Sequence, residues 1–431
     1  MSFARVAATL VTITCLTLAA PAGAHGAAPD CQGPAGDPQP GTAEWRERDA
    51  NNVFCGAQRH LDQAQHPNNA APVSGAMYGL APMSLTDAYR EPSRHDGKRF
   101  RFDAATITNR EGEALAAEVY RPLKTSAPPY PAVVVLHGGG SRKELHWWSS
   151  QTLAEAGYMV VAFDGAAGDI PNAKDVLDWL LATPARPTKA GEFNPFWRDL
   201  DRHRIGLAGH SMGGQAASVL GQEDPRVTAI VSWDRGTGLQ LPKELRTPTL
   251  FFVSDYACQA NPVCQPEPYL EPPQGEGPGE RGKEYEIVHA AGVDSMKIGL
   301  RATTHLDWTP SEPSGNRYGE LVSVYFTLAW FDRYLKGAGR PRTAAEAYRR
   351  LTAERFDASA DVHNISQGVF DPVKALAAGD PDGGNVPYRI AGLPVADRLS
   401  FYFRSKCFIT VPPGMGGPRV TSDDMRGEGC R

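Results

Sequence analysis

Residues 204–214 read Arg-Ile-Gly-Leu-Ala-Gly-His-Ser-Met-Gly-Gly, and this stretch decides how the rest of the chain is interpreted. Its first half is a short apolar run typical of a buried strand, and a small-residue helical pattern follows at 215–220. Between them lies Gly-x-Ser-x-Gly, in which Gly209 and Gly213 supply the room that a serine needs on so sharp a turn. Ser211 is therefore a candidate nucleophile, and the alternative is a glycine-rich turn that holds a serine by chance.

The composition is that of a globular protein and argues against a nucleic-acid partner. Of the 431 residues, 41% are hydrophobic and 22% are charged, which suits one large domain with extensions or two domains. The formal net charge is -5 at pH 7, and the sequence has no basic stripe to neutralise phosphates. It also contains no zinc, P-loop or dinucleotide-binding motif, so we expect neither a metal nor a cofactor.

The first 24 residues have the pattern of a secretory signal peptide. Arg5 gives a positive start, an apolar core follows at 6–20, and Ala22-Gly23-Ala24 is a small-residue cleavage site. A core of this length is too short to span a bilayer. We therefore expect cleavage after Ala24, export to the periplasm or the extracellular space, and no stable membrane insertion.

Six cysteines remain after the signal segment, and an even number in an exported chain favours disulfide bonds. They form three couples that are local in the sequence. The predicted pairs are Cys31 with Cys55, Cys258 with Cys264, and Cys407 with Cys430. Free buried thiols are the alternative.

Apolar runs alternate with helical patterns from residue 99 onward. The expected strands are Arg99–Ile107, Ala114–Tyr120, Pro131–Leu136, Tyr158–Phe163, the run before Ser211, Val227–Trp233, Thr249–Val253 and Met296–Leu300, and the expected helices include Ala173–Leu181, Lys283–Ala291 and Leu321–Leu335. Such alternation predicts an α/β fold with a mostly parallel central sheet and helices on both faces. We assign a catalytic domain to 99–337, an N-terminal extension to 25–98, and a C-terminal extension packed on that domain to 338–431.

A serine hydroxyl becomes a strong nucleophile when a histidine takes its proton and a carboxylate orients that histidine. His305 follows the expected strand 296–300 and is the preferred base. His289 is the alternative, but it falls inside an expected helix, where a structural or surface role is more typical.

The acid has two main candidates. Asp255 follows the expected strand 249–253 and is preferred. Asp234 ends the preceding strand and remains the rival. Asp164 also ends a strand, but aspartates at strand ends are often simply turn residues.

Together these motifs resemble an α/β-hydrolase of the dienelactone hydrolase and bacterial cutinase-like group, which includes polyester hydrolases. The similarity covers about 99–337. It rests on His137-Gly138-Gly139, the Gly-His-Ser-Met-Gly-Gly around Ser211, the acid after Pro248-Thr249-Leu250, His305, and Ala329-Trp330-Phe331. The polyester hydrolases carry their acid about two residues further on, where this chain has Ala257.

The resemblance also implies an oxyanion hole and a substrate contact. The backbone N–H of Met212 and one from Gly139 or Gly140 are implied for the oxyanion. Trp233 is implied for the substrate, because the related enzymes have a tryptophan beside the substrate cleft.

We therefore expect a secreted serine hydrolase that cleaves small or polymeric carboxylic esters through Ser211, His305 and Asp255. An amidase or peptidase with the same residues is one alternative. A catalytically silent binding protein with this fold is the other.

Overall fold

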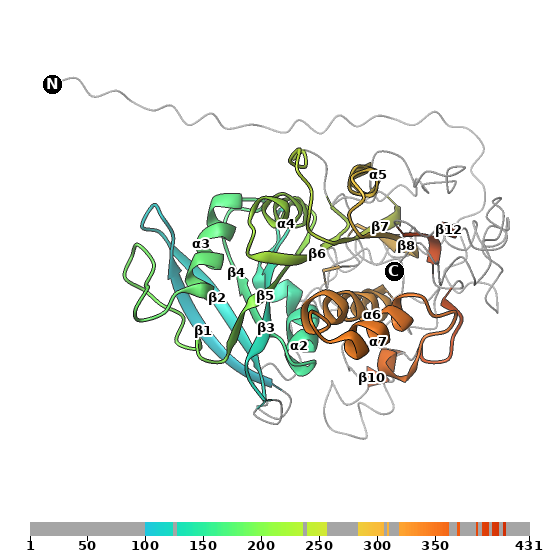
Figure 1. The fold of residues 1–431 in the computed structure, drawn as a ribbon, viewed down its shortest axis with the longest axis horizontal. Helices are drawn as coiled ribbons and strands as arrows, with labels where there is room; N and C mark the ends of the chain where they lie inside the picture. The colour runs from blue at the N-terminus through green and yellow to red at the C-terminus, as the bar shows by residue number, and fades with distance from the viewer. Residues whose placement is uncertain are drawn as a thin grey trace, which may run out of the picture.

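A computed structural model describes most of the chain from residue 100 to residue 410 (Figure 1). The described residues are 100–123, 127–235, 239–256, 283–305, 308–309, 319–361, 369–370, 385–386, 390–395, 399–404 and 408–410. The expected signal peptide, the N-terminal extension and all six cysteines of the predicted disulfides lie outside these ranges. Those expectations stay predictions.

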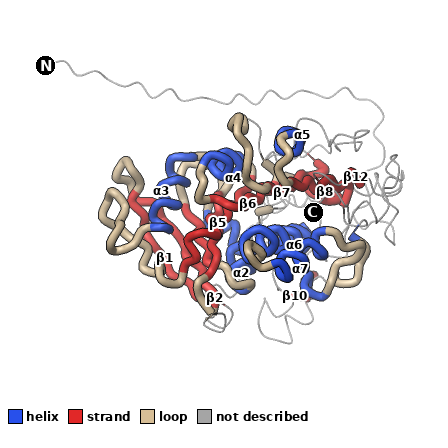
Figure 2. The backbone as a smooth tube through the Cα atoms, in the orientation of Figure 1, coloured by secondary structure: helices blue, strands red, loops and turns tan. Residues whose placement is uncertain are grey.

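The centre of the described part is a ten-stranded sheet (Figure 2). Its strands are β1 (Phe100–Thr108), β2 (Ala114–Pro122), β3 (Tyr130–Leu136), β4 (Met159–Phe163), β5 (Leu200–His210), β6 (Val227–Trp233), β7 (Thr249–Tyr256), β8 (Ser295–Thr304), β11 (Leu399–Arg404) and β12 (Phe408–Thr410). They lie in the order β1-β2-β4-β3-β5-β6-β7-β8-β11-β12, and β3 to β8 are parallel. A separate short pair is formed by β9 (Val369–Phe370) and β10 (Asn385–Val386).

Helices cover both faces of the sheet. They are α2 (Trp147–Glu155), α3 (Ile170–Leu181), α4 (Met212–Glu223), α5 (Lys283–Ala290), α6 (Gly319–Phe331) and α7 (Pro341–Leu351), with short helical turns η2 (Lys143–His146), η3 (Asp332–Lys336) and η4 (Ala358–Asp361). Apolar residues of α3 and α4 pack in one core cluster, and those of α2 and α6 pack in another. In Figure 1 these two sets of helices lie on opposite sides of the sheet.

Strand β3 shows why the sheet requires two covered faces. Val133 and Val135 belong to the cluster with α2 and α6, whereas Val134 belongs to the cluster with α3 and α4. Side chains alternate between the faces of a strand, so a strand that is apolar at every position must be buried on both. The expected mostly parallel sheet with helices on both faces is confirmed.

Segments beyond residue 337 join the same sheet. Strand β11 pairs antiparallel with β8, with Leu399 opposite Leu300, and β12 pairs antiparallel with β11. An ion pair connects helix α7 with η3, because Arg350 Nη2 lies 2.5 Å from Asp332 Oδ2. Chain on both sides of residue 337 thus contributes to one sheet.

Two strands end later than the sequence indicated, and this changes what lies at the carboxyl edge. Strand β7 continues to Tyr256 rather than ending at Val253, and β8 continues to Thr304 rather than to Leu300. His305 therefore follows its strand directly. Asp255 is a strand residue and not the first residue of a loop.

Candidate active site

Ser211 occupies a strained turn between β5 and α4. Its φ is 55° and its ψ is -121°, a conformation that residues other than glycine rarely adopt. A Cβ added at Gly209 would lie 2.4 Å from the carbonyl oxygen of Gly213, and one at Gly213 would lie 2.4 Å from that of His137. Such distances leave room only for glycine. The Gly-x-Ser-x-Gly pattern thus forms the sharp turn that the sequence indicated.

His305 faces Ser211 from the end of β8. Its Nε2 lies 2.9 Å from Ser211 Oγ, which is hydrogen-bond distance. The alternative histidine, His289, is exposed on α5 and stacks on Tyr285 with ring centroids 5.5 Å apart. The structure therefore brings Ser211 together with His305.

Asp234, and not Asp255, holds the other side of the imidazole. Asp234 Oδ2 lies 2.6 Å from His305 Nδ1, and the Asp234 side chain is 1% exposed. This pattern fits a neutral imidazole that donates from Nδ1 and accepts the serine proton at Nε2. Our prediction that Asp255 orients His305 is wrong, because the bond that we assigned to it is made by the rival aspartate.

The reason lies in how the two strands end. Strand β6 stops at Trp233, and the backbone N–H of Asp234 then donates to the carbonyl of Phe252 at 3.0 Å. Asp234 has a φ of 41°, so the chain turns sharply at this residue. Strand β7 instead runs on through Asp255 to Tyr256.

The glycine turn after β3 lies against the nucleophile. A Cβ added at Gly138 would be 2.9 Å from Ser211 Cβ, and one at Gly139 would be 3.0 Å from Met212 Sδ. Gly140 has a φ of 67°, which favours glycine. Met212 is the first residue of α4, so its backbone N–H has no partner within the helix. Gly138 and Gly139 thus lie against Ser211 and Met212, whereas a Cβ at Gly140 would meet no atom within 4 Å.

An ion-pair cluster fixes the segment that follows this glycine turn. The backbone N–H of Lys143 donates to Asp164 Oδ1 at 2.9 Å, and its Nζ lies 2.6 Å from Asp164 Oδ2 and 2.5 Å from Glu144 Oε1. Burial disfavours the charged lysine, but the hydrogen bonds to Asp164 and Glu144 outweigh it and raise the pKa of Lys143. Asp164 therefore anchors a loop and does not orient His305.

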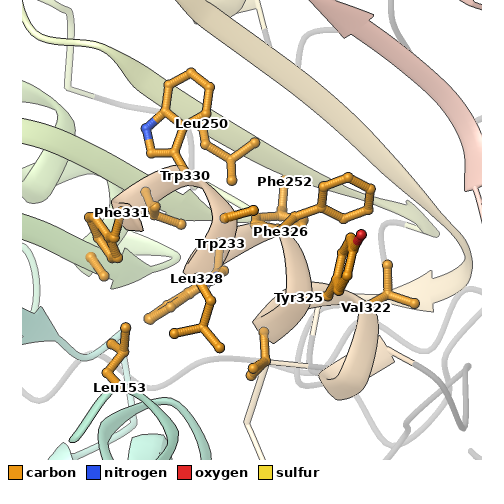
Figure 3. Packing of buried hydrophobic residues seen from close by; sticks show 14 of the residues in the cluster. Leu153, Trp233, Leu250, Phe252, Val322, Tyr325, Phe326, Leu328, Trp330 and Phe331 are labelled. Carbon is orange, nitrogen blue, oxygen red and sulfur yellow. The ribbon is translucent and has the colours of Figure 1, made fainter. Parts of the chain in front are cut away.

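Trp233 does not line the site as the resemblance implied. Its side chain is 0% exposed, and its indole N–H donates to Thr327 Oγ1 of α6 at 3.2 Å. The ring packs on Trp148 with centroids 5.1 Å apart. Figure 3 shows Trp233 among buried residues of α6 and β7. Trp233 is a core residue beneath the turn, and the substrate contact that we assigned to it is incorrect.

Two further histidines lie behind His305 and were not singled out by the sequence. The His210 ring is tilted against His305 with ring centroids 4.7 Å apart, and the His146 ring centroid lies 6.0 Å from that of His210. Burial, reinforced for His210 by the nearby imidazoles of His305 and His146, lowers the pKa of His210 well below its usual value. Burial first, and then the charge of His137, lowers the pKa of His146 to about 3. Both rings are therefore neutral near pH 7. The sequence offered one indication for His210, its position directly before the nucleophile, and none for His146.

The described part of the chain contains neither a cluster of metal ligands nor a membrane-spanning helix. No group of three or more His, Cys, Asp and Glu side chains in this part of the chain is arranged to hold a metal ion. Within the same ranges, no helix combines the length and apolar character that crossing a membrane requires.

Comparison with known proteins places this geometry in context. Residues 93–273 match the family model described as PETase, PET hydrolase-like. Over 138 residues the chain is 28% identical to the non-reducing polyketide synthase mapC' of Penicillium brevicompactum, covering 28% of this chain and 6% of that protein. Over 194 residues it is 30% identical to an uncharacterized protein of Pseudomonas aeruginosa, covering 40% of this chain and 50% of that protein. The chain thus spans half or less of each relative.

The family match confirms the resemblance to polyester hydrolase-like α/β-hydrolases, and with it the α/β-hydrolase fold. The matched range includes Ser211 and Asp234 and ends before His305. The family match supports an ester hydrolase with a small or polymeric substrate.

Proposed function

We propose that this protein is a secreted serine hydrolase that cleaves carboxylic esters through Ser211, His305 and Asp234. The observation that carries the proposal is the hydrogen-bonded series from Ser211 Oγ to His305 Nε2, at 2.9 Å, and from His305 Nδ1 to Asp234 Oδ2, at 2.6 Å. A nucleophile, a base and an orienting acid in this order are the parts that acyl transfer requires. The family match supports an ester as the substrate class.

In the first half of the reaction, Ser211 Oγ attacks the carbonyl carbon of the ester and His305 Nε2 takes the serine proton. Asp234 stabilises the imidazolium that forms, because its buried carboxylate faces Nδ1. The carbonyl oxygen becomes an oxyanion, to which Met212 and Gly139 or Gly140 donate backbone N–H groups. The bond to the alcohol oxygen then breaks, and His305 returns the proton to the leaving alkoxide.

In the second half, water attacks the acyl group on Ser211. His305 accepts a proton from that water and then returns it to Ser211 Oγ as the acid leaves. Each proton in this scheme passes between Ser211, His305, water and the substrate, so the scheme uses no metal and no organic cofactor.

An accessible apolar side chain supports a substrate with an apolar portion. Met212 is 42% exposed, although it directly follows the nucleophile. Exposed methionines are adaptable apolar contacts, since the thioether chain adopts several shapes. Short activated esters are therefore suitable first substrates, and a polyester film tests the polymeric class.

The test is labelling with a fluorophosphonate probe followed by peptide mapping, together with the Ser211→Ala variant. We expect the label on Ser211, and loss of ester hydrolysis by several powers of ten in the variant without unfolding. Amides with chromogenic amines, assayed in parallel, distinguish an amidase. Absence of both labelling and turnover would instead favour a catalytically silent binding protein.

Secretion has its own experiment. Expression of the full chain with its first 24 residues, followed by N-terminal sequencing of the exported protein, should return a sequence that begins at His25. An exported protein that retains Arg5 would contradict cleavage.

A further inference from the structure

We propose that Ser254 is a positioning residue that holds the Asp234 carboxylate toward His305. The inference rests on the proposed function, because it concerns how the acid of that site is oriented. Ser254 lies on β7, and its side chain is fully buried beside the end of β6.

Asp234 needs external support because its backbone is strained. Within the described ranges, the residues other than glycine that have a positive φ are Ser211 and Asp234. These two residues are also the ends of the hydrogen-bonded series through His305. Strained residues persist only where their surroundings over-determine them, and they cluster at functional sites. The neighbours of Asp234 should therefore include groups that fix it.

Ser254 contacts both oxygens of that carboxylate. Its backbone N–H donates to Asp234 Oδ1 at 3.2 Å, and its hydroxyl donates to Asp234 Oδ2 at 2.7 Å. Rotation of an aspartate carboxyl about its last bond is only weakly restricted by rotamer preferences. Two bonds from one residue to two oxygens remove that freedom. Oδ2, which also faces His305 Nδ1 at 2.6 Å, is thereby kept in place.

The direction of the hydroxyl bond follows from the chemistry of the acceptor. An ionised carboxylate only accepts hydrogen bonds, so the Ser254 hydroxyl must donate its proton to Oδ2. Bonds of this kind to a charged oxygen are stronger than neutral ones and offset the cost of burying the charge. Without the hydroxyl, the carboxylate would lose a buried donor and part of its orientation.

The test compares Ser254→Ala with Ser232→Ala. Ser232 is a fully buried serine on β6, two residues before Asp234, and no hydrogen bond connects its hydroxyl with the carboxylate. We expect Ser254→Ala to slow fluorophosphonate labelling of Ser211 and to lower kcat for a short ester by about 10- to 100-fold, as loss of a hydrogen bond to a charged group predicts. KM should change little, because Ser254 touches no substrate. Ser232→Ala should label at close to the wild-type rate.

A double-mutant cycle with Asp234→Asn separates positioning from a general packing defect. If Ser254 acts through the carboxylate, Ser254→Ala should cause almost no further slowing once Asp234 is replaced. Equal slowing in both backgrounds, or wild-type labelling by Ser254→Ala, would overturn the inference. If Ser254→Ala does not fold, Ser254→Cys keeps a weaker donor at the same place and should give intermediate slowing, whereas a wild-type rate would again overturn it. Failure of the unmodified protein to be labelled on Ser211 would instead contradict the proposed function.

Discussion

His210 Nε2 donates a hydrogen bond to the backbone carbonyl of His305 at 2.7 Å, so the residue before the nucleophile holds the residue proposed as the base. A carbonyl oxygen only accepts, which fixes the proton of the neutral His210 ring on Nε2. The same ring faces the glycine turn, since a Cβ at Gly138 would lie 3.1 Å from His210 Nδ1. His210 thus connects the base with the segment implied for the oxyanion hole.

His210→Phe tests this connection. The variant keeps a planar ring next to His305 and removes the donor to its carbonyl. Because one neutral hydrogen bond is lost, we expect kcat for a short ester to fall by about three- to tenfold with little change in the melting temperature. His289→Phe is the matched control, since His289 is exposed on α5, and it should retain wild-type kcat. Equal rates for the two variants would show that the His210 bond has no role in turnover.

The acid assignment is tested by comparing two substitutions of the same kind. Asp234→Asn places an amide opposite His305 Nδ1 and should lower kcat by about 10⁴, as a wrong-tautomer lesion does in an analogous site. Asp255→Asn should retain most of the activity, because the bond to His305 Nδ1 comes from Asp234. Steady-state kinetics of both variants decide the matter, and a larger loss in Asp255→Asn would return the role to that residue.

Lys143→Met tests whether the ion-pair cluster positions the glycine turn. The substitution keeps the apolar stem and removes the charge between Asp164 and Glu144, so the segment after Gly140 loses an anchor. We expect kcat/KM to fall by about tenfold, because catalysis is sensitive to displacements of about 1 Å. Arg142→Met is the control, since Arg142 is exposed and lies 3.8 Å from Glu144. A similar effect of both variants would argue against a role of the buried lysine.

The sequence identified Ser211 and His305 because each depends on local signals. The Gly-x-Ser-x-Gly motif is contiguous in the sequence, and Gly209 is required by the carbonyl of Gly213, four residues away, although Gly213 itself is required by the carbonyl of His137. His305 directly follows a strand. The acid depends instead on tertiary structure. The sequence places an aspartate near the end of two neighbouring strands, Asp234 after Trp233 and Asp255 after Ser254. What distinguishes the two candidates is the turn at Asp234 and the added length of β7, and both are features of the folded chain.

The resemblance to polyester hydrolase-like proteins predicted the fold and the glycine turn correctly, but the substrate contact that it implied for Trp233 was wrong. The side chain lies inward because Trp148 of α2 and Thr327 of α6 contact it, and no local pattern reveals packing between elements so far apart in sequence. Sequence patterns did not indicate roles for Lys143 and Ser254 either, because these roles also depend on contacts between separate elements. Their partners, Asp164 and Asp234, lie about twenty residues away, directly after strands β4 and β6.

Burial of His146 predicts that the protein loses stability as the solution is acidified. The imidazole is fully buried, and its pKa falls from 6.5 to about 3. Between these values the unfolded chain binds a proton that the folded protein does not. The stability that comes from the neutral ring is therefore complete above pH 6.5 and is lost as the pH falls toward 3, by about 1.4 kcal/mol per pH unit.

His146→Phe should reduce this loss. The phenyl ring preserves the stacking on Trp233, where the His146 ring lies 6.3 Å away at 13°, and it cannot take up a proton. Urea unfolding at pH 7.5 and pH 5.0 should show a free energy of unfolding that falls by about 2 kcal/mol less in the variant than in the wild type. His289→Phe, which removes an exposed histidine, should behave as the wild type does. An unchanged acid sensitivity in His146→Phe would mean that His146 takes up its proton in the folded protein near its ordinary pKa.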